Sequence, residues 1–122
     1  MPHNYIEKVV DTLGIDDFFK HKIFETSKAL IANNASIGII KICLFGSVSR
    51  GTATMSSDLD FLVLVEQDSH LAYKKIRDLE LDDDIGRPNI DITVRTIAEM
   101  KDDTVRFNTE IKKDAIILWE RD

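Results

Sequence analysis

The chain has 122 residues, of which 43% are hydrophobic and 31% charged, and its formal net charge is −6 at pH 7. This length predicts a single domain, residues 1–122, with a hydrophobic core of its own. The negative charge argues against broad nucleic-acid binding, because neutralising phosphates takes clustered Lys and Arg. The one cysteine, Cys43, excludes an internal disulfide and a thiolate cluster, and its apolar neighbours favour a core thiol over a reactive one.

The sequence shows no signal for export or membrane insertion. Its first residues are acidic and amphipathic, whereas a signal peptide begins with basic residues followed by an apolar run. No stretch approaches the ~18 consecutive apolar residues of a membrane-spanning helix. We therefore expect a cytoplasmic protein without a membrane partner.

Residues 1–35 are predicted to form two N-terminal helices. Apolar residues recur at helical spacing in the first segment, which Gly14 can close. Asp16 is a candidate N-cap for a second helix that reaches about Asn33, where the sequence NNAS interrupts the pattern. The apolar stripe of the first helix consists of Ile6, Val9, Val10 and Leu13.

The remaining segment, residues 36–122, is predicted to be a mixed α/β core. The β-branched run Ile39–Phe45 indicates a central strand, apolar on both faces. Residues Gly46–Ser57 are rich in Ser and poor in apolar residues, which indicates a turn with at most one helical turn. Asp58–Val65 then reads as a second strand, with its two aspartates on the same face as two leucines.

The second half of this core continues the alternation of helix and strand. A helix is expected to begin at Asp68 or Ser69 and to end in the acidic connection LDDDIGRPN. Asn89–Thr96 alternates apolar with polar residues and predicts a half-buried strand. One short helix is expected within residues 97–112, and a closing strand over Ala115–Trp119. Trp119 is more typical of a core residue than of a base-stacking one.

Aspartates cluster on two of these predicted strands, close to a Gly-Ser turn. Asp58 and Asp60 stand at the head of the second strand, and Asp91 is the acidic residue inside the third. Side chains two residues apart on a strand share a face, so Asp58 and Asp60 would repel each other. A divalent cation resolves that repulsion, and hard oxygen ligands suit Mg²⁺ or Mn²⁺. Each aspartate alone also fits an ordinary cap or a solvated strand end.

The turn before the second strand carries groups that suit phosphate. Gly46 has no Cβ, which lets the backbone approach a ligand, and Ser47 adds a hydroxyl donor. Arg50 lies one helical turn further and offers a guanidinium fork that matches phosphate oxygens. Arg95, on the predicted face of Asp91, is a weaker candidate for phosphate or partner contact. Together these residues indicate a triphosphate site, although a Gly-Ser turn alone is common.

The string FGSVSRGTATMSSDLDFLVLV resembles the signature of the DNA polymerase β-like nucleotidyltransferases, in which Gly-Ser is followed by ten residues and then Asp-x-Asp. The variant GSxxRGTAxxxSDxDxxV is similar to that of the minimal nucleotidyltransferases, or MNT proteins. The resemblance extends from Ile39 to Glu120, since NIDITVRT is similar to the strand that bears the family's third carboxylate and KKDAIILWE to its closing strand. It implies a polymerase β-like nucleotidyltransferase fold, a small mixed sheet flanked by helices.

The resemblance also implies roles for the site residues. Gly46 and Ser47 would hold the β- and γ-phosphates of ATP, and Arg50 would bind phosphate. The metal ligands are carried over in the same way, position by position. Two Mg²⁺ (or Mn²⁺) ions would be bound by Asp58 and Asp60, and the catalytic one also by Asp91, which would help to deprotonate the attacking hydroxyl.

For MNT proteins the resemblance implies a partner, a HEPN-type helical toxin. The chain would act as its antitoxin by transferring AMP from ATP to a toxin tyrosine. The chain's brevity favours an acceptor presented by a partner. Two alternatives stay open: a binding module that occludes the toxin without catalysis, and a small-molecule nucleotidyltransferase of the aminoglycoside type that builds its acceptor pocket as a homo-oligomer.

Overall fold

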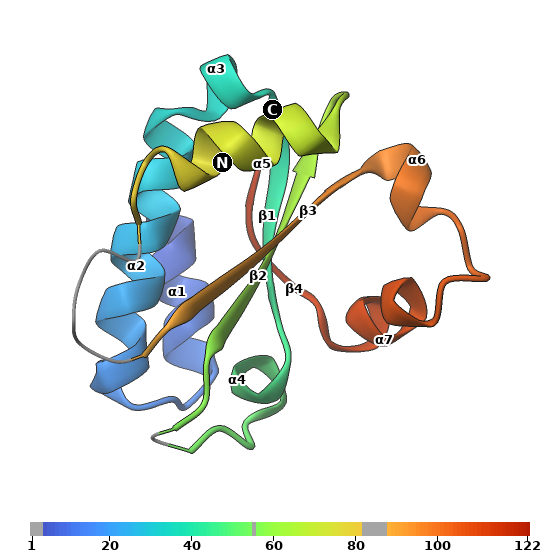
Figure 1. The fold of residues 1–122 in the computed structure, drawn as a ribbon. Coiled ribbons are helices and arrows are strands. Elements are labelled where there is room, and N and C mark those ends of the chain that lie inside the picture. The colour runs from blue at the N-terminus through green and yellow to red at the C-terminus, as the bar shows by residue number, and fades with distance from the viewer. Residues whose placement is uncertain (1–3, 55, 82–87) are drawn as a thin grey trace.

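A four-stranded mixed sheet lies at the centre of the computed structural model, which describes residues 4–54, 56–81 and 88–122 (Figure 1). The strand order is β3-β2-β1-β4, in which β1 pairs antiparallel with both β2 and β4, and β2 pairs parallel with β3. This arrangement confirms the predicted mixed α/β class. The strands are β1 (Ile39–Phe45), β2 (Leu59–Val65), β3 (Ile90–Thr96) and β4 (Ile116–Glu120).

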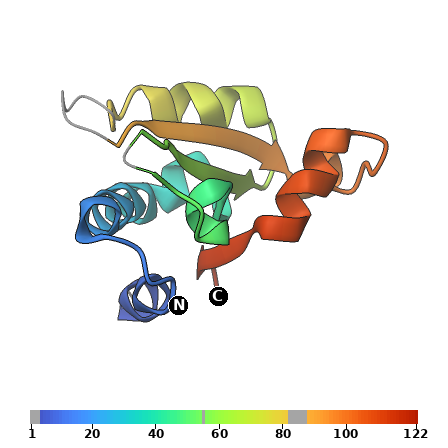
Figure 2. The ribbon, with the colours of Figure 1, turned by 90° about the horizontal axis from the view of Figure 1, so that it is seen from below.

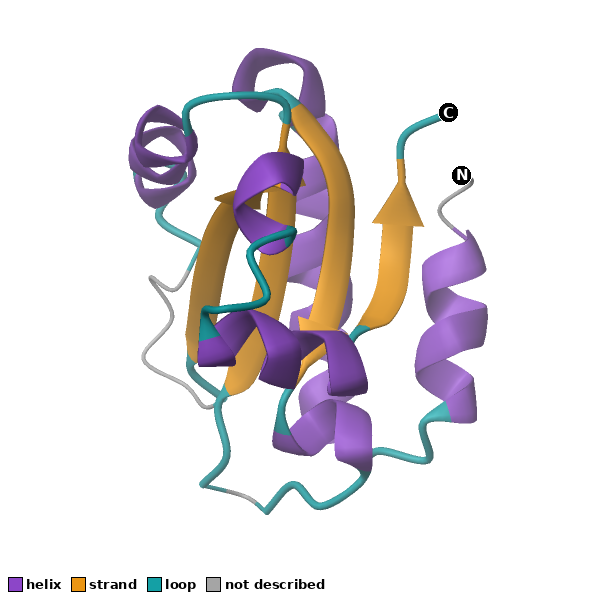
Figure 3. Cartoon of the chain, turned by 90° about the vertical axis from the view of Figure 1, so that its right-hand side faces the viewer, coloured by secondary structure: helices purple, strands orange, loops and turns teal. Residues whose placement is uncertain are grey.

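Helices cover both faces of the sheet. Viewed along the sheet, α1 and α2 lie on one face, and α6 and α7 lie on the other (Figure 2). Figure 3 shows α6 and α7 in front of the sheet and α1 and α2 behind it. The helices are α1 (Asn4–Thr12), α2 (Asp17–Ala32), α3 (Asn34–Ile37), α4 (Ser47–Arg50), α5 (Ser69–Arg77), α6 (Ile97–Met100) and α7 (Arg106–Asp114).

The two N-terminal helices begin and end close to the predicted positions. Asp16 is the N-cap of α2, where its carboxylate accepts a hydrogen bond of 3.0 Å from the Phe18 amide. The sequence NNAS interrupts α2 as expected, but a further short helix, α3, forms there. Gly38, at φ +81°, closes α3 in the left-handed conformation that favours glycine.

The C-terminal part contains two helices, α6 and α7, where one was predicted. Thr96 and Glu99 form a capping box: the Glu99 amide donates to Thr96 Oγ1 at 3.1 Å, and Glu99 Oε1 accepts from the Thr96 amide at 2.8 Å. Both bonds satisfy amides at the start of α6, so a helix forms there in addition to the predicted one. The closing strand spans Ile116–Glu120, one residue later than expected.

The helix after β2 begins as predicted. Its N-cap is Asp68, whose carboxylate accepts a hydrogen bond of 3.1 Å from the Leu71 amide. The acidic connection that follows α5 includes residues 82–87, which lie outside the described residues. In the described part of the chain, no helix is both long and apolar enough to cross a membrane.

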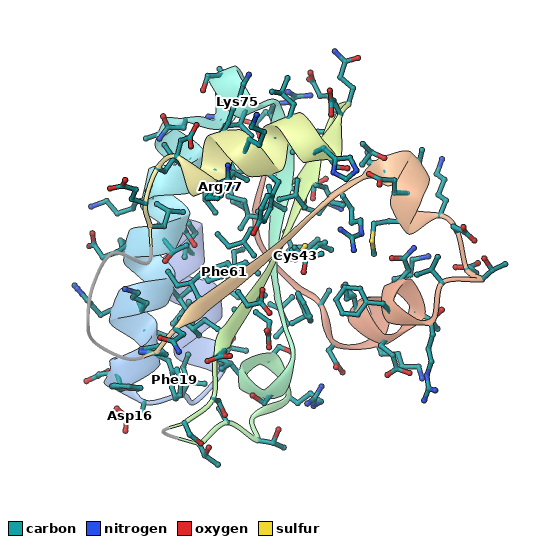
Figure 4. All side chains as sticks on the ribbon, in the orientation of Figure 1. Asp16, Phe19, Cys43, Phe61, Lys75 and Arg77 are labelled. Atoms are coloured by element: carbon teal, nitrogen blue, oxygen red, sulfur yellow. The ribbon has the colours of Figure 1, made fainter. Side chains whose placement is uncertain are left out.

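The sheet separates two apolar clusters. The larger one lies between the sheet and the helices α1 and α2. It includes Phe61 at the centre of the sheet and Phe19 on α2 (Figure 4). Trp119 is 6% exposed and belongs to this cluster, as predicted for a core residue. The smaller cluster consists of Cys43, Leu62, Met100 and Ile111. Burial raises the pKa of the Cys43 thiol to about 11, which agrees with a core role.

Candidate functional site

The sheet brings two of the predicted carboxylates together. Asp60 and Asp91 are direct partners in the parallel register of β2 and β3, and Asp60 is also the partner of Phe45 at the end of β1. Because side chains alternate along a strand, Asp60 lies on the same face of β2 as Leu62 of the smaller cluster. The two aspartates thus lie at one end of the sheet, on the face that carries α7.

Asp58 contributes from outside the strand. The strand was predicted to begin at Asp58, but β2 begins one residue later, at Leu59. Asp58 is exposed in the loop before β2, whereas Asp60 is half-buried. The two carboxylates are still close enough to interact electrostatically, since the charge of Asp58 acts on the titration of Asp60.

Asp60 has the most perturbed titration of the site carboxylates. Its pKa is raised from 3.8 to about 6, first because burial disfavours the charged form, and then because Asp91 and Asp58 repel a further negative charge. The guanidinium of Arg50 acts in the opposite direction. The site is therefore a self-repelling group of carboxylates with one cation beside it.

Gly46 shapes the turn that faces Asp60. Its backbone has φ +81° and ψ −158°, a conformation essentially confined to glycine. A Cβ at this position would overlap Asp60 Oδ2 and lie 3.1 Å from Asp60 Cγ. The turn therefore lies directly against the carboxylate, and glycine is required there for two separate reasons.

The turn continues into α4, and local hydrogen bonds hold the two together. The Arg50 amide donates to the Gly46 carbonyl at 3.1 Å, and Ser49 Oγ donates to the same carbonyl at 2.9 Å. The Thr52 amide donates to the Ser47 carbonyl at 2.9 Å. One helical turn thus follows β1, as predicted, and it presents Ser47 and Arg50 from a tightly bonded loop.

Arg50 has a protein partner that the sequence did not reveal. Its Nη1 donates to Asp114 Oδ2 at 2.6 Å, which joins α4 to the last residue of α7. The two residues are 64 positions apart, and no periodicity or motif links them. Their pairing depends on how α7 packs on the sheet.

Arg95 lies on the same strand as Asp91, towards the other end of β3. In the β2–β3 register it is the partner of Leu64, four positions along the strand from Asp91. Its guanidinium carbon lies 6.0 Å from the centre of the Phe107 ring, and its Nη1 donates to the Val94 carbonyl at 2.9 Å. These contacts account for Arg95 without a ligand.

The carboxylates suit a hard divalent cation in their chemistry. All three offer oxygen, and the pKa of Asp60 is raised first by burial and then by repulsion from Asp91 and Asp58, which a cation would relieve. Within the residues that the structure describes, however, no three His, Cys, Asp or Glu side chains already form a group that could hold a metal ion. Asp60 and Asp91 are adjacent in the sheet, and Asp58 would have to turn inward from its exposed loop to join them.

Comparison with known proteins agrees with this fold. The nucleotidyltransferase domain family matches residues 25–117, and the chain belongs to that family. Among curated proteins no sequence matches at a significant level. The fold agrees as well, because solved nucleotidyltransferase structures resemble the mixed sheet and its flanking helices.

Three solved structures illustrate the likeness. A chain called a minimal nucleotidyltransferase has 26% identity and a TM-score of 0.54, over 84% of this chain and 97% of that one. A chain from Sulfolobus solfataricus called a nucleotidyltransferase has 22% identity and a TM-score of 0.55, over 88% and 92%. A structure called a toxin-antitoxin with AMP-PNP has 21% identity and a TM-score of 0.51, over 77% and 73%.

Proposed function

We propose that the chain is a metal-dependent nucleotidyltransferase that transfers AMP from ATP to a tyrosine hydroxyl of a HEPN-type helical toxin, and that it acts as the antitoxin. The observation that carries this proposal is the pairing of Asp60 with Asp91 in the β2–β3 register, beside the turn at Gly46. Membership of the nucleotidyltransferase domain family supports the reaction class.

The phosphate donors in this proposal come from the turn after β1. Gly46 and Ser47 would hold the β- and γ-phosphates through backbone amides and the Ser47 hydroxyl. Arg50 would add a charge-assisted hydrogen bond to a phosphate oxygen. The tight bonding of α4 supports this assignment, because donors that are already ordered lose less entropy when the ligand binds.

The carboxylates Asp58, Asp60 and Asp91 would hold Mg²⁺ or Mn²⁺. When bound, the metal would supply charge stabilisation for the attacking and leaving oxygens. The chain's own residues would then need to do little covalent chemistry, because nucleotidyl transfer depends mainly on positioning and electrostatics.

The reaction follows from these roles. The acceptor hydroxyl attacks the α-phosphorus in line with the bond to the β-phosphate oxygen, the new phosphate ester forms, and pyrophosphate leaves. Asp91 takes the hydroxyl proton, while Ser47 and Arg50 hold the departing phosphates. Asp91 is exposed on β3, which supports this role because an acceptor from another molecule has to reach it.

The partner in this proposal is a protein. One structural neighbour is called a toxin-antitoxin with AMP-PNP, which supports both a toxin partner and an adenine nucleotide. The acceptor is therefore expected on the helical toxin, and the modification is expected to neutralise it.

Mass spectrometry of the partner tests the proposal. The chain is co-purified with the product of a neighbouring gene as the candidate toxin and incubated with ATP and Mg²⁺. The expected result is one or more added AMP units on a tyrosine, absent with the Asp58→Asn/Asp60→Asn double variant. Neutralisation of the toxin by that double variant would instead favour occlusion. Efficient adenylylation of a small alcohol or an aminoglycoside by the chain alone would favour the small-molecule enzyme.

A further inference from the structure

The ion pair between Arg50 and Asp114 links the candidate phosphate turn to the far end of the chain. Arg50 Nη1 and Asp114 Oδ2 are 2.6 Å apart, with side-chain exposures of 50% and 22%. Surface ion pairs usually contribute little to stability. This one differs from the other pairs on α7 in where it lies, because its cation is on α4, which follows directly on the Gly46 turn that lies against Asp60.

Asp114 stands on a well-anchored base. It is the last residue of α7, and the next amide, that of Ala115, donates to the Ile111 carbonyl at 2.9 Å. The Ile111 side chain is 1% exposed in the smaller apolar cluster. Beyond Ala115 the chain enters β4, which pairs with β1. The backbone is thus anchored both before and after Asp114.

From this arrangement we infer that Asp114 is a positioning residue, which holds the Arg50 guanidinium in place for the triphosphate. The inference rests on the proposed function, in which Arg50 contacts phosphate. An arginine side chain loses rotamer freedom when it is fixed, which opposes binding. A carboxylate that fixes it before the ligand arrives removes much of that loss from binding.

The geometry of a guanidinium allows both contacts at once. It carries five N–H donors in one plane, so a bond from Nη1 to Asp114 is compatible with phosphate contacts through the other donors. Asp114 would itself repel a triphosphate, as any nearby carboxylate would. When the Asp114 charge is removed, a positioning role therefore predicts weaker triphosphate binding, and simple repulsion predicts tighter binding.

Equilibrium binding separates these two roles. Dissociation constants for ATP, inorganic tripolyphosphate and AMP are measured with Mg²⁺ for the wild type and for Asp114→Asn, Asp114→Glu and Arg50→Met. The matched control is Asp103→Asn, which removes the 2.8 Å pair between Asp103, in the loop before α7, and Lys112 on that helix. Thermal melting of each variant reports folding.

We expect Asp114→Asn to weaken the binding of ATP and of tripolyphosphate about tenfold and to leave the binding of AMP nearly unchanged. Asp114→Glu should restore most of the affinity, and Asp103→Asn should match the wild type. In the Arg50→Met background Asp114→Asn should not weaken binding, because the positioning effect acts through Arg50 and only the repulsion by Asp114 is then removed. Unchanged or tighter ATP binding by Asp114→Asn, or an equal loss without Arg50, overturns the inference. A wild type that binds none of the triphosphates would instead overturn the proposed function.

If Asp114→Asn is unstable, Arg50→Lys provides a second test of the positioning role. A lysine keeps the charge but cannot bridge Asp114 and a phosphate with one planar fork. Its ATP affinity should fall by a similar factor while the melting temperature stays near that of the wild type. Wild-type affinity in Arg50→Lys would show that a fixed guanidinium is unnecessary and would contradict the positioning role.

Discussion

The carboxylate of Asp60 occupies the space that a side chain at position 46 would need, because a Cβ on Gly46 would overlap Asp60 Oδ2. The candidate phosphate turn and a candidate metal ligand are therefore in direct contact across β1 and β2. A change on one side is expected to disturb the other.

Gly46→Ala should destabilise the fold and abolish turnover. The backbone conformation alone costs about 1–3 kcal/mol for a non-glycine residue, and the overlap with Asp60 adds to it. Gly51→Ala is the matched control, since Gly51 also has positive φ, at +75°, but nothing within 4 Å of a Cβ. Urea unfolding should give the larger loss for Gly46→Ala, and Asp60→Ala should reduce that loss. Equal losses at the two glycines would contradict the contact.

Asp60→Asn should stabilise the metal-free protein at neutral pH. The folded-state pKa of Asp60 is raised to about 6 from 3.8, so ionised Asp60 opposes folding. The free energy of unfolding of the wild type therefore has no penalty from Asp60 below about pH 4, where this carboxyl is protonated. It decreases as the pH rises through about 6, where the carboxyl ionises in the folded protein. Allowing for solvent screening of a half-buried group, Asp60→Asn should gain about 1–2 kcal/mol.

This gain is measured by urea unfolding in EDTA at pH 4.5 and at pH 7.5. The variant should approach the wild type at the lower pH and exceed it at the higher one. Asp103→Asn, at an exposed site, controls for the loss of one negative charge. A difference that is the same at both pH values would show that the pKa of Asp60 is not raised in the folded protein.

ATP with Mg²⁺ or Mn²⁺ should raise the melting temperature of the wild type by several degrees. The carboxylates repel one another when no cation is bound, and a ligand at 100 times its dissociation constant adds about 2.7 kcal/mol. Asp60→Asn should lose most of this shift. Differential scanning fluorimetry with each NTP is the measurement, and a wild type that does not respond to any of them would exclude the site.

Ser47→Ala should weaken nucleotide binding moderately and leave the fold intact. Losing one neutral hydrogen bond costs about 0.5–1.5 kcal/mol, which corresponds to roughly 2- to 10-fold in the dissociation constant. Isothermal titration with ATP measures it. Ser49→Ala is a useful comparison, because Ser49 Oγ bonds to the Gly46 carbonyl within the turn. A larger loss for Ser49→Ala than for Ser47→Ala would argue against direct contact between Ser47 and phosphate.

Much of the fold could be predicted from local pattern. Strand β1 appears in the sequence as an apolar run that only Lys41 interrupts and β3 as an alternating one, because each pattern reflects how many faces of the strand are covered. Asp16 and Asp68 act as predicted N-caps, since capping depends only on residues nearby in sequence. The sequence Thr-x-x-Glu at Thr96 is also typical of a capping box, but the prediction placed only one helix within residues 97–112.

The rest depended on tertiary packing. Nothing local distinguishes Asp58, which lies just before β2, from Asp60 within it, because strand ends are decided by pairing with the neighbouring strand. The Arg50–Asp114 pair spans 64 positions and follows from the packing of α7. The sequence therefore predicts which residues carry the chemistry better than which residues hold them in place.

Label transfer from ATP tests the central claim most directly. The chain and the proposed helical toxin are incubated with Mg²⁺ and with ATP labelled at either the α- or the γ-phosphate, and the proteins are separated. The account predicts that α-label appears on the partner, that γ-label appears only in pyrophosphate, and that Asp60→Asn abolishes both signals. Transfer of γ-label to the partner, or α-label transfer that is undiminished in Asp60→Asn, would contradict it.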